Sequence, residues 1–397
     1  MRRYLRLAIV LPLAMGSLSA SALDLFEERL RIHGFASQAV VDTSDNQYFG
    51  DSTGTSFDFT ELGLNASYRF TPRILLSSQV LVRRAGDMYD GTPSIDYALA
   101  DITASSTSEA RFGARLGRIK NPLGLYNETR DVPFTRPGIF LPQVIYYDKV
   151  RNLVLSSDGV MFFGETYGEA GTLSLNLGVG QPIIDDNAEW TYLGDDFEGR
   201  LEPRDPTWIA NLWIASPTER LRAGLGVVAS SLSYDAFESS FLESGSIGFI
   251  NTILSLQYND EQWTLSAEYS RMPLEWKEFG PVFPFSKQTT EGYYLQGAYR
   301  PRPNLELSLR YEEGFADRND RDGSRSSALT GGLTPPFDFY SKIWTAGLRW
   351  DVKPNLMLRF EYQRHAGTFA LSIRENPDPS DLVKHWDAFA ASISVRF

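Results

Sequence analysis

Side chains able to perform covalent or metal chemistry are scarce in this 397-residue sequence. The three histidines, His33, His365 and His385, fall in no metal-binding spacing such as H-E-x-x-H, and no G-x-S-x-G nucleophile motif is present. The absence of cysteine excludes disulfides and thiolate metal sites. We therefore expect no enzyme activity, no bound metal and no cofactor. The chemistry that remains is the electrostatic attraction and repulsion of dissolved ions.

One long interval, residues 119–157, collects charged side chains together with residues that break secondary structure. Its breakers are Pro122, Gly124, Pro133, Pro137, Gly138 and Pro142. The charged candidates in and just before it are Arg118, Lys120, Glu128, Arg130, Asp131 and Arg136. Loops of this length are uncommon in compact domains unless they are functional. A functional loop is therefore predicted here, with a solvated surface loop as the alternative.

The segments on both sides of this interval alternate apolar and polar residues. Leu305, Leu307 and Leu309 alternate with polar residues, and the same period of two recurs in residues 173–179, 263–269 and 356–362. A helix would instead place apolar residues three and four positions apart. After residue 22 no apolar run is long enough for a transmembrane helix. The pattern predicts an all-β fold, a transmembrane antiparallel β-barrel whose backbone groups are satisfied by strand pairing.

About sixteen strands are expected, an even number as in single-chain bacterial barrels. Their predicted starts are near Arg31, Ser56, Arg73, Asp96, Glu109, Gly159, Thr172, Pro206, Arg220, Gly245, Glu261, Thr289, Asn304, Tyr340, Asn355 and Lys384. Tight turns and long connections alternate between these strands. This alternation is typical of a barrel with short periplasmic turns and long external loops, and a soluble β-sandwich is the alternative.

The amino-terminal residues 1–22 have the pattern of a secretory signal peptide. Arg2, Arg3 and Arg6 precede an apolar stretch, and Ala20-Ser21-Ala22 forms a small-residue cleavage site. Residues 23–397 are then expected to form a single barrel domain, because no linker or charge run divides them. The formal charge of -12 disfavours nucleic acid as a partner.

The last strand carries apolar residues at every second position and ends on phenylalanine. These residues are Phe389, Ala391, Ile393, Val395 and Phe397. The pattern resembles the carboxy-terminal signature of Gram-negative outer-membrane barrels. The resemblance implies export through the periplasm, insertion into the outer membrane by barrel-assembly machinery, and a role for Phe397 as the assembly signal.

In length, strand count and loop order, residues 23–397 resemble the trimeric Gram-negative porins. This resemblance implies that the interval 119–157, between the fifth and sixth strands, folds inward as a constriction loop. It also implies a homotrimer in contact with outer-membrane lipid and lipopolysaccharide. The short stretch from Gly117 to Gly124 resembles the G-x-x-K-x-P-x-G segment of phosphate-selective porins.

Strand phase predicts which charged side chains face the lumen. Phe112, Ala114 and Leu116 are assigned to the outer face, so Arg111 and Arg115 are predicted to face inward. The same argument places Arg83, Arg310, Arg349 and Arg359 inside, and it places acidic residues inside as well: Glu61, Asp101, Glu268, Glu306, Glu312, Asp351 and Glu361. A basic patch of Arg83, Arg111 and Arg115 opposite Glu128 and Asp131 would give a transverse field that sorts solutes by charge. The alternative is that each charge neutralises a neighbour across a wet wall.

The outward residues of the first, fourth and last strands are small, which suits close packing against another protein wall. They are Gly34, Ala36, Ala98, Ala100, Ala104 and Ala391. The sequence as a whole predicts a passive channel for small hydrophilic solutes or ions in the outer membrane. A non-conducting structural or adhesive barrel and a substrate-specific anion channel of the phosphate type are the alternatives.

Overall fold

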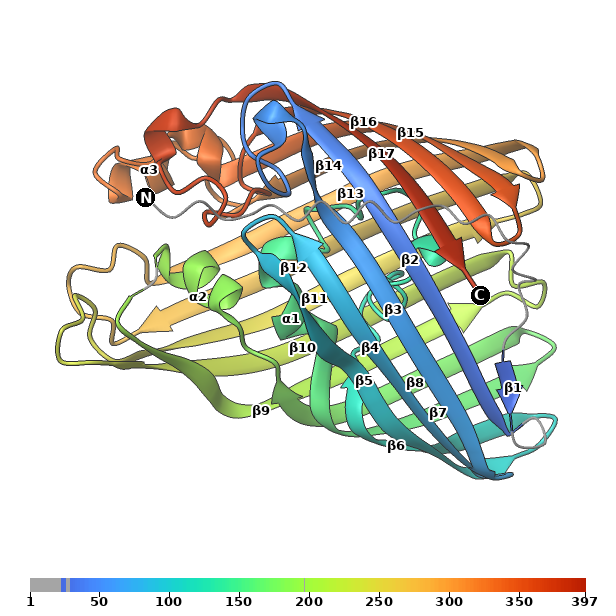
Figure 1. The fold of residues 1–397 in the computed structure, drawn as a ribbon. Helices are drawn as coiled ribbons and strands as arrows, with labels where there is room; N and C mark the ends of the chain where they lie inside the picture. The colour runs from blue at the N-terminus through green and yellow to red at the C-terminus, as the bar shows by residue number, and fades with distance from the viewer. Residues whose placement is uncertain (1–22, 26–28, 196) are drawn as a thin grey trace.

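The computed structural model describes residues 23–25, 29–195 and 197–397, and within them the chain forms a closed antiparallel β-barrel of sixteen strands (Figure 1). The predicted signal peptide, residues 1–22, lies outside the described residues. The barrel strands are β2 (Leu30–Thr43), β3 (Ser56–Thr71), β4 (Ile74–Ala85), β5 (Tyr89–Ser106), β6 (Ala110–Lys120), β7 (Ser156–Gly168), β8 (Gly171–Pro182), β9 (Gly199–Ala215), β10 (Leu221–Ala236), β11 (Gly245–Asn259), β12 (Trp263–Lys277), β13 (Lys287–Arg302), β14 (Leu305–Phe315), β15 (Tyr340–Lys353), β16 (Leu356–Gly367) and β17 (His385–Arg396). A short strand, β1 (Leu23–Leu25), pairs with the start of β2. The predicted all-β barrel is confirmed.

The ring closes because β17 pairs with β2. The register runs from Ala388 opposite Thr43 to Arg396 opposite Phe35. Beyond it, the Phe397 N–H donates to the Gly34 carbonyl at 3.0 Å, and the Gly34 N–H donates to the Phe397 carbonyl at 3.2 Å. Each barrel strand therefore has two paired neighbours, although the first part of β9 pairs with β10 alone. The role of Phe397 as an assembly signal stays a prediction.

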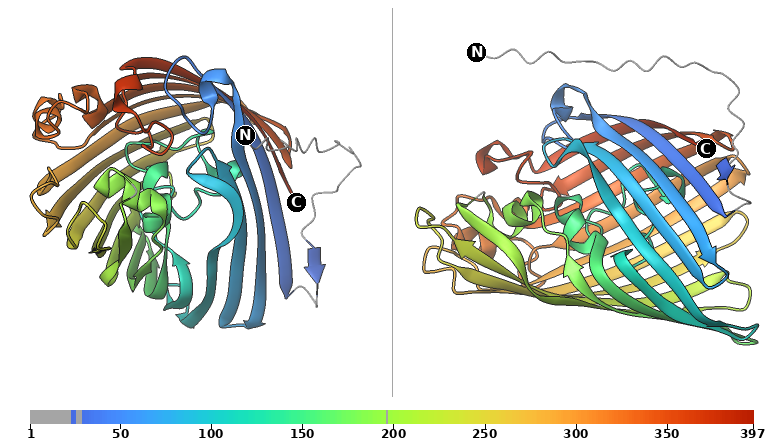
Figure 2. Two further views of the ribbon diagram at one scale, coloured as in Figure 1. Left: turned by 60° about the vertical axis from the view of Figure 1, so that its left-hand side comes forward. Right: turned by 60° about the horizontal axis from the view of Figure 1, so that its bottom comes forward.

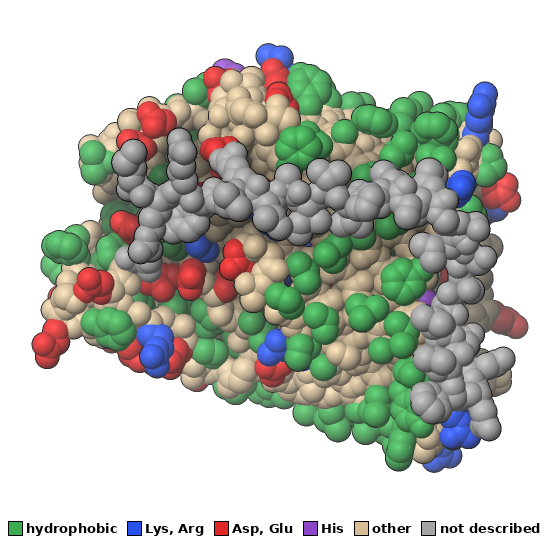
Figure 3. All heavy atoms as spheres, viewed as in Figure 1, with side chains coloured by type: hydrophobic (Ala, Val, Ile, Leu, Met, Phe, Trp, Pro, Cys, Tyr) green, Lys and Arg blue, Asp and Glu red, His purple; other side chains and the backbone are tan. Residues whose placement is uncertain are grey.

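The two faces of the barrel differ in polarity because successive side chains of a strand point to opposite sides. On β8, Leu173, Leu175 and Leu177 are 42–47% exposed. Apolar side chains cover much of the outer surface of the strands in Figure 3. Polar side chains on the other face, such as Asn211 of β9 and Ser230 of β10, are buried. An apolar exterior around a polar interior is the arrangement that a barrel in lipid requires.

Short and long connections alternate, so the barrel has a short-turn end and a long-loop end. The short turns are 72–73, 107–109, 169–170, 216–220, 260–262, 303–304 and 354–355, and the connections at the long-loop end are 44–55, 86–88, 121–155, 183–198, 237–244, 278–286, 316–339 and 368–384. The helices are η1 (Ser52–Gly54), η2 (Pro133–Thr135), η3 (Asp148–Val150), α1 (Arg151–Leu155), α2 (Asp186–Leu193), α3 (Ser324–Leu329), η4 (Pro336–Phe339) and η5 (Pro379–Asp381). Among the described residues, each helix is too short or too polar to cross a membrane.

Two strands begin several residues earlier in the sequence than predicted. β5 begins at Tyr89 instead of near Asp96, and β9 begins at Gly199 instead of near Pro206. Bulges explain both differences. The pairing of β5 with β4 shifts register at Ile95, and the pairing of β9 with β10 shifts twice around Asp205. The early part of β9 pairs with β10 alone, where a proline without an N–H is tolerated.

A buried carboxyl group is one of several polar groups that join the loops on either side of the closing seam. Glu375, in 368–384, accepts the N–H of Gly50 at 2.7 Å and the N–H of Phe49 at 3.1 Å, both in 44–55. Both donors lie in the left-handed region, with φ of 59° at Phe49 and 95° at Gly50. Burial raises the pKa of Glu375 to about 7, aided by Asp87 and Asp148 and opposed by these two N–H groups.

This junction between the two loops is expected to weaken as pH rises. The folded-state pKa of Glu375 lies above its ordinary value of 4.5, so its contribution to stability is complete below about pH 4.5 and is lost as pH passes through 7. Amide hydrogen exchange at Phe49 and Gly50, corrected for the intrinsic rate, should be faster at pH 8 than at pH 5. A Glu375→Gln variant should lose this pH dependence. Equal protection at both pH values in the parent protein would contradict the prediction.

Candidate functional site

The segment 121–155 is an insertion whose two ends meet. β6 and β7 pair as far as Lys120 opposite Ser156, and the Asn121 N–H donates to the Leu155 carbonyl at 2.9 Å. Between these points the chain makes only short helical turns, as the prolines predict. Gly124 has a φ of 64°, a conformation that favours glycine. The segment therefore leaves the barrel wall and returns to it at one place.

One side of the segment is held by charged residues of β3 and β4. Arg136 donates to Glu61 of β3 through both terminal nitrogens, at 2.6 and 3.1 Å. Arg83 of β4 donates to Asp148 at 2.8 Å. Arg130 donates to the same Asp148 oxygen at 3.4 Å. All five side chains are buried, so these ion pairs are shielded from water.

The other side of the segment contacts β12 and β13. Glu268 of β12 accepts the Leu125 N–H at 2.8 Å and the Tyr146 hydroxyl at 2.6 Å. It also accepts the Tyr294 hydroxyl of β13 at 2.9 Å. A Cβ at Gly292 of β13 would lie 2.2 Å from the carbonyl oxygen in this segment at position 144, so glycine permits the close approach. In a ring of sixteen strands β4 and β12 lie opposite each other, and the segment joins these opposite walls (Figure 2).

A third group of contacts comes from β14 and β16, and it binds the backbone of the segment. Arg310 of β14 donates to the Phe140 carbonyl at 3.3 Å. Arg359 of β16 donates to the Gly138 carbonyl at 2.7 Å, and Glu361 accepts the Ile139 N–H at 2.7 Å. The tip of the segment is thus fixed by main-chain hydrogen bonds to charged side chains, which are stronger than neutral ones.

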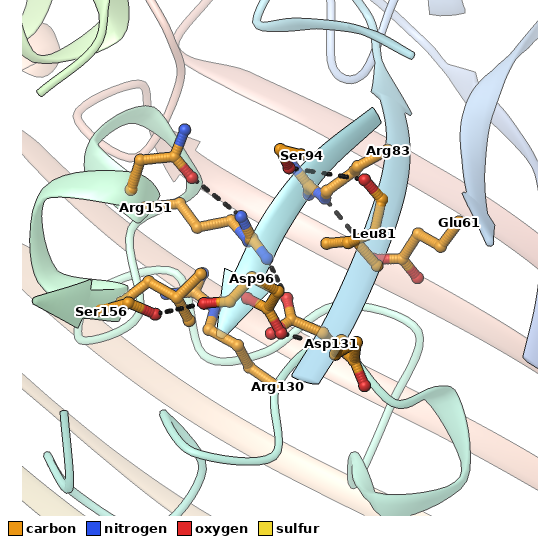
Figure 4. A network of polar contacts seen from close by, with 12 residues as sticks. Glu61, Leu81, Arg83, Ser94, Asp96, Arg130, Asp131, Arg151 and Ser156 are labelled. Carbon is orange, nitrogen blue, oxygen red and sulfur yellow. Dashed lines mark hydrogen bonds and ion pairs between the residues drawn. The ribbon is translucent and has the colours of Figure 1, made fainter. Parts of the chain in front are cut away.

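Around α1 a compact network pairs two cations with two carboxylates (Figure 4). Lys120 lies 2.7 Å from Asp96 of β5 and also binds Asp131, which is bound in turn by Arg151. Burial alone would raise the pKa of Asp131, but Arg151 and Lys120 hold that pKa well below its usual value. Asp131 is therefore an ionised structural anchor. It does not face the basic patch that the sequence predicted it would oppose.

A smaller group of charged side chains remains partly exposed. Arg111 and Arg115 of β6 both bind Asp101 of β5, at 3.5 and 3.1 Å. Their side chains are 36% and 25% exposed, and Glu128 of the segment, 3.9 Å from Arg115, is 50% exposed. Two guanidinium groups and two carboxylates, Asp101 and Glu128, therefore form a charge-balanced group in contact with water. Its two arginines are the part of the predicted basic patch that is open to ions in solution.

Arg118 was predicted to line the pore, and the structure places it on the outer face. Its register on β6 gives it the same phase as Leu116 and Phe112, which are exposed on the exterior. It donates to Asp158 of β7 through two nitrogens, both at 2.8 Å. Arg118 directly precedes the segment but still belongs to β6, so the alternation of that strand points its side chain outward.

The remaining candidates are buried against the segment. Arg83, Lys120, Arg130, Asp131, Arg136, Arg310 and Arg359 are each less than 10% exposed. Sequence reasoning missed Asp96, whose phase on β5 matches the outward Ala98. A bulge between Ile95 and Tyr97 turns its side chain inward, and no sequence signal marks that bulge. No group of three or more potential metal ligands occurs in the described part of the chain.

Comparisons with known proteins support the fold. No protein-family model matches the chain, and no curated protein has significant sequence similarity to it. Among solved structures, OmpT, an outer membrane protein of Vibrio cholerae, aligns with a TM-score of 0.56 and 12% identity over 94% of this chain and 99% of that chain. The outer membrane channel DcaP of Acinetobacter baumannii aligns with a TM-score of 0.54 and 14% identity over 92% and 96%. OprB of Pseudomonas putida aligns with a TM-score of 0.55 and 11% identity over 94% and 95%.

Identities this low establish a shared fold and nothing finer. The structure and these likenesses together show that the chain has the β-barrel fold of these outer-membrane proteins. The resemblance of residues 117–124 to phosphate-selective porins receives no support from a family match.

Proposed function

We propose that this protein is a passive diffusion channel for small hydrophilic solutes or ions in the outer membrane. The protein would reach that membrane by export through the periplasm. The observation that carries the proposal is the segment 121–155, which joins opposite walls through charged and polar contacts. A wall-to-wall segment narrows the lumen at one level and fixes its size. No group with the geometry of a nucleophile and base is needed for such a role.

The charges beside the segment would set ion preference. Arg111 and Arg115 are partly exposed; they share Asp101, and Arg115 also lies 3.9 Å from Glu128, so positive and negative charge balance in this group. Glu128 lies on the opposing segment with half of its side chain in water. A transverse field between these groups is the mechanism proposed for charge selection.

A second candidate function is a barrel with a closed interior that serves structure or adhesion. It is favoured by the apolar contacts of the segment with the inner wall, where Leu123, Val144 and Tyr146 belong to one buried cluster with Ile209 of β9 and Ile253 of β11. This cluster fills one side of the lumen. The partly exposed charged groups on β5 and β6 mark where we propose the path for solutes.

Association into homotrimers, contact with lipopolysaccharide and insertion by barrel-assembly machinery also belong to the proposal. The small outward residues Ala98 and Ala100 of β5 support a protein–protein contact on that side, because small side chains let two walls approach closely. A homotrimer would leave the pore of each copy separate.

Removing the exposed positive charges should make the channel more cation-selective. An Arg111→Ser, Arg115→Ser double variant leaves Asp101 and Glu128 to dominate the local potential. Reversal potentials in a KCl gradient should shift toward the potassium potential, most strongly near 0.01 M, where the Debye length is about 30 Å. At about 1 M, where it is about 3 Å, the shift should nearly vanish.

The matched control for this experiment is Arg118→Ser. It removes one arginine from the same strand but from the outer face. Its reversal potential should equal that of the parent protein. If the control shifts selectivity as much as the double variant does, the charges on β6 do not act through the lumen.

A further inference from the structure

Three arginines and two carboxylates form a continuous buried chain between the wall and the segment. Arg136 binds Glu61 through two nitrogens, and Arg83 lies 3.5 Å from Glu61 through Nε. Arg83 also donates to Asp148, which is shared with Arg130. Figure 4 shows Glu61 on β3, Arg83 on β4 and Arg130 on the segment.

This chain carries an excess of positive charge. Guanidinium groups stay protonated in proteins, so three cations face two anions. The nearby charges are already engaged: Arg151 and Lys120 bind Asp131 and Asp96, and Arg310 binds Glu312 at 2.9 Å. Arg359, next to the chain, donates to carbonyls of the segment, including that of Arg136. A buried excess of charge is unfavourable unless a counter-ion accompanies it.

The same three arginines have donors with nothing to bind. Arg83 Nη1, Arg130 Nη1 and Arg136 Nε are buried and have no acceptor among the described residues. The three residues are 6%, 3% and 7% exposed. Buried N–H groups in proteins are almost always hydrogen-bonded, so three orphans on adjacent cations indicate a missing acceptor.

A small cavity lies where these side chains meet. It has a volume of about 10 Å³, and the charged side chains in its lining are the three arginines, Arg151, Glu61 and Asp148. A space of that size holds about one water molecule. A halide ion is somewhat larger than water and requires small shifts of these side chains, whereas phosphate, sulfate and carboxylate ligands are far too large.

We propose that the cavity between Arg83, Arg130 and Arg136 binds a monoatomic halide, with chloride as the natural ligand. The halide accepts the three orphan N–H groups and neutralises the excess charge. It thereby holds the segment against β3 and β4. The inference deepens the proposed function, because it places an anion site beside the proposed constriction, yet it does not depend on conduction.

The test is a crystal structure of the full-length mature protein grown with sodium bromide in place of chloride. We expect an anomalous bromine peak within hydrogen-bonding distance of Arg83 Nη1, Arg130 Nη1 and Arg136 Nε. An Arg130→Gln variant, which balances the charges of the chain, should lose the peak. An Arg111→Gln variant, which removes an arginine elsewhere in the lumen, should keep it.

Density at the cavity without an anomalous peak in the parent protein would identify a water and overturn the inference. The parent experiment decides the matter even if Arg130→Gln fails to fold. Conductance of the same preparation separates the two claims. A conducting protein without bromide overturns the halide site alone, and a non-conducting protein with bromide bound overturns the channel alone.

Discussion

Replacing residues 122–154 with a two-residue Asn-Gly turn is expected to raise single-channel conductance severalfold. The ends of the segment are already hydrogen-bonded to each other, from Asn121 N–H to the Leu155 carbonyl. A tight turn can therefore join β6 to β7 without straining the barrel. The narrowest section of a pore sets its electrical resistance, and this change removes the residues that join β4 to β12.

The same deletion should admit larger sugars in liposome-swelling assays. The deletion leaves charged residues of the wall, such as Glu61 and Glu268, without their partners in the segment. Water in the widened lumen would solvate these side chains, so the barrel should still fold. Correct folding can be checked by heat-dependent migration on gels. Unchanged conductance together with an unchanged sugar limit would mean that the segment does not control the pore.

The second large effect is expected from Glu268→Ala. This carboxylate accepts four hydrogen bonds, two from the segment and two from the wall: Leu125 N–H, Tyr146 hydroxyl, Ser255 hydroxyl and Tyr294 hydroxyl. A hydrogen bond to a charged group contributes about 1.5–3 kcal/mol. Losing the two from the segment should favour its detachment from β12 by about 3 kcal/mol or more, which is roughly a hundredfold in population.

A loosened segment should appear as frequent transitions to a higher conductance in single-channel recordings. It should also become cleavable by protease in detergent. Glu306→Ala is the matched control, since Glu306 of β14 also faces inward but pairs with Arg300 of the wall at 2.7 Å and makes no hydrogen bond to the segment. Current noise equal to that of the control would show that Glu268 does not anchor the segment.

The barrel was predictable from sequence because the outer face of each strand is apolar and its inner face is polar. The alternation of Leu305, Leu307 and Leu309 with polar residues fixes both the strand and its inward face, and β14 has that phase. Positions where the period breaks were not predictable. Pro203 and Pro206 resemble breakers, yet β9 runs through both of them at bulges against a single neighbour.

The candidate site was predictable in part for the same reason. Strand phase placed Arg83 and Glu268 on the inner face, where the structure has them bound to Asp148 and Tyr146. Those partners lie 65 and 122 positions away in the chain, and no local pattern specifies such pairs. The path of the segment is set by these long-range contacts, so its composition predicted a loop without predicting which residues it would bury.

Planar-bilayer recording of the detergent-purified protein measures directly whether the barrel conducts. We expect stepwise insertions with an ohmic current–voltage relation and an ion preference that Arg111→Ser, Arg115→Ser shifts toward cations. Folded protein that inserts into the bilayer and leaves it sealed would rule out a channel and favour a closed structural barrel.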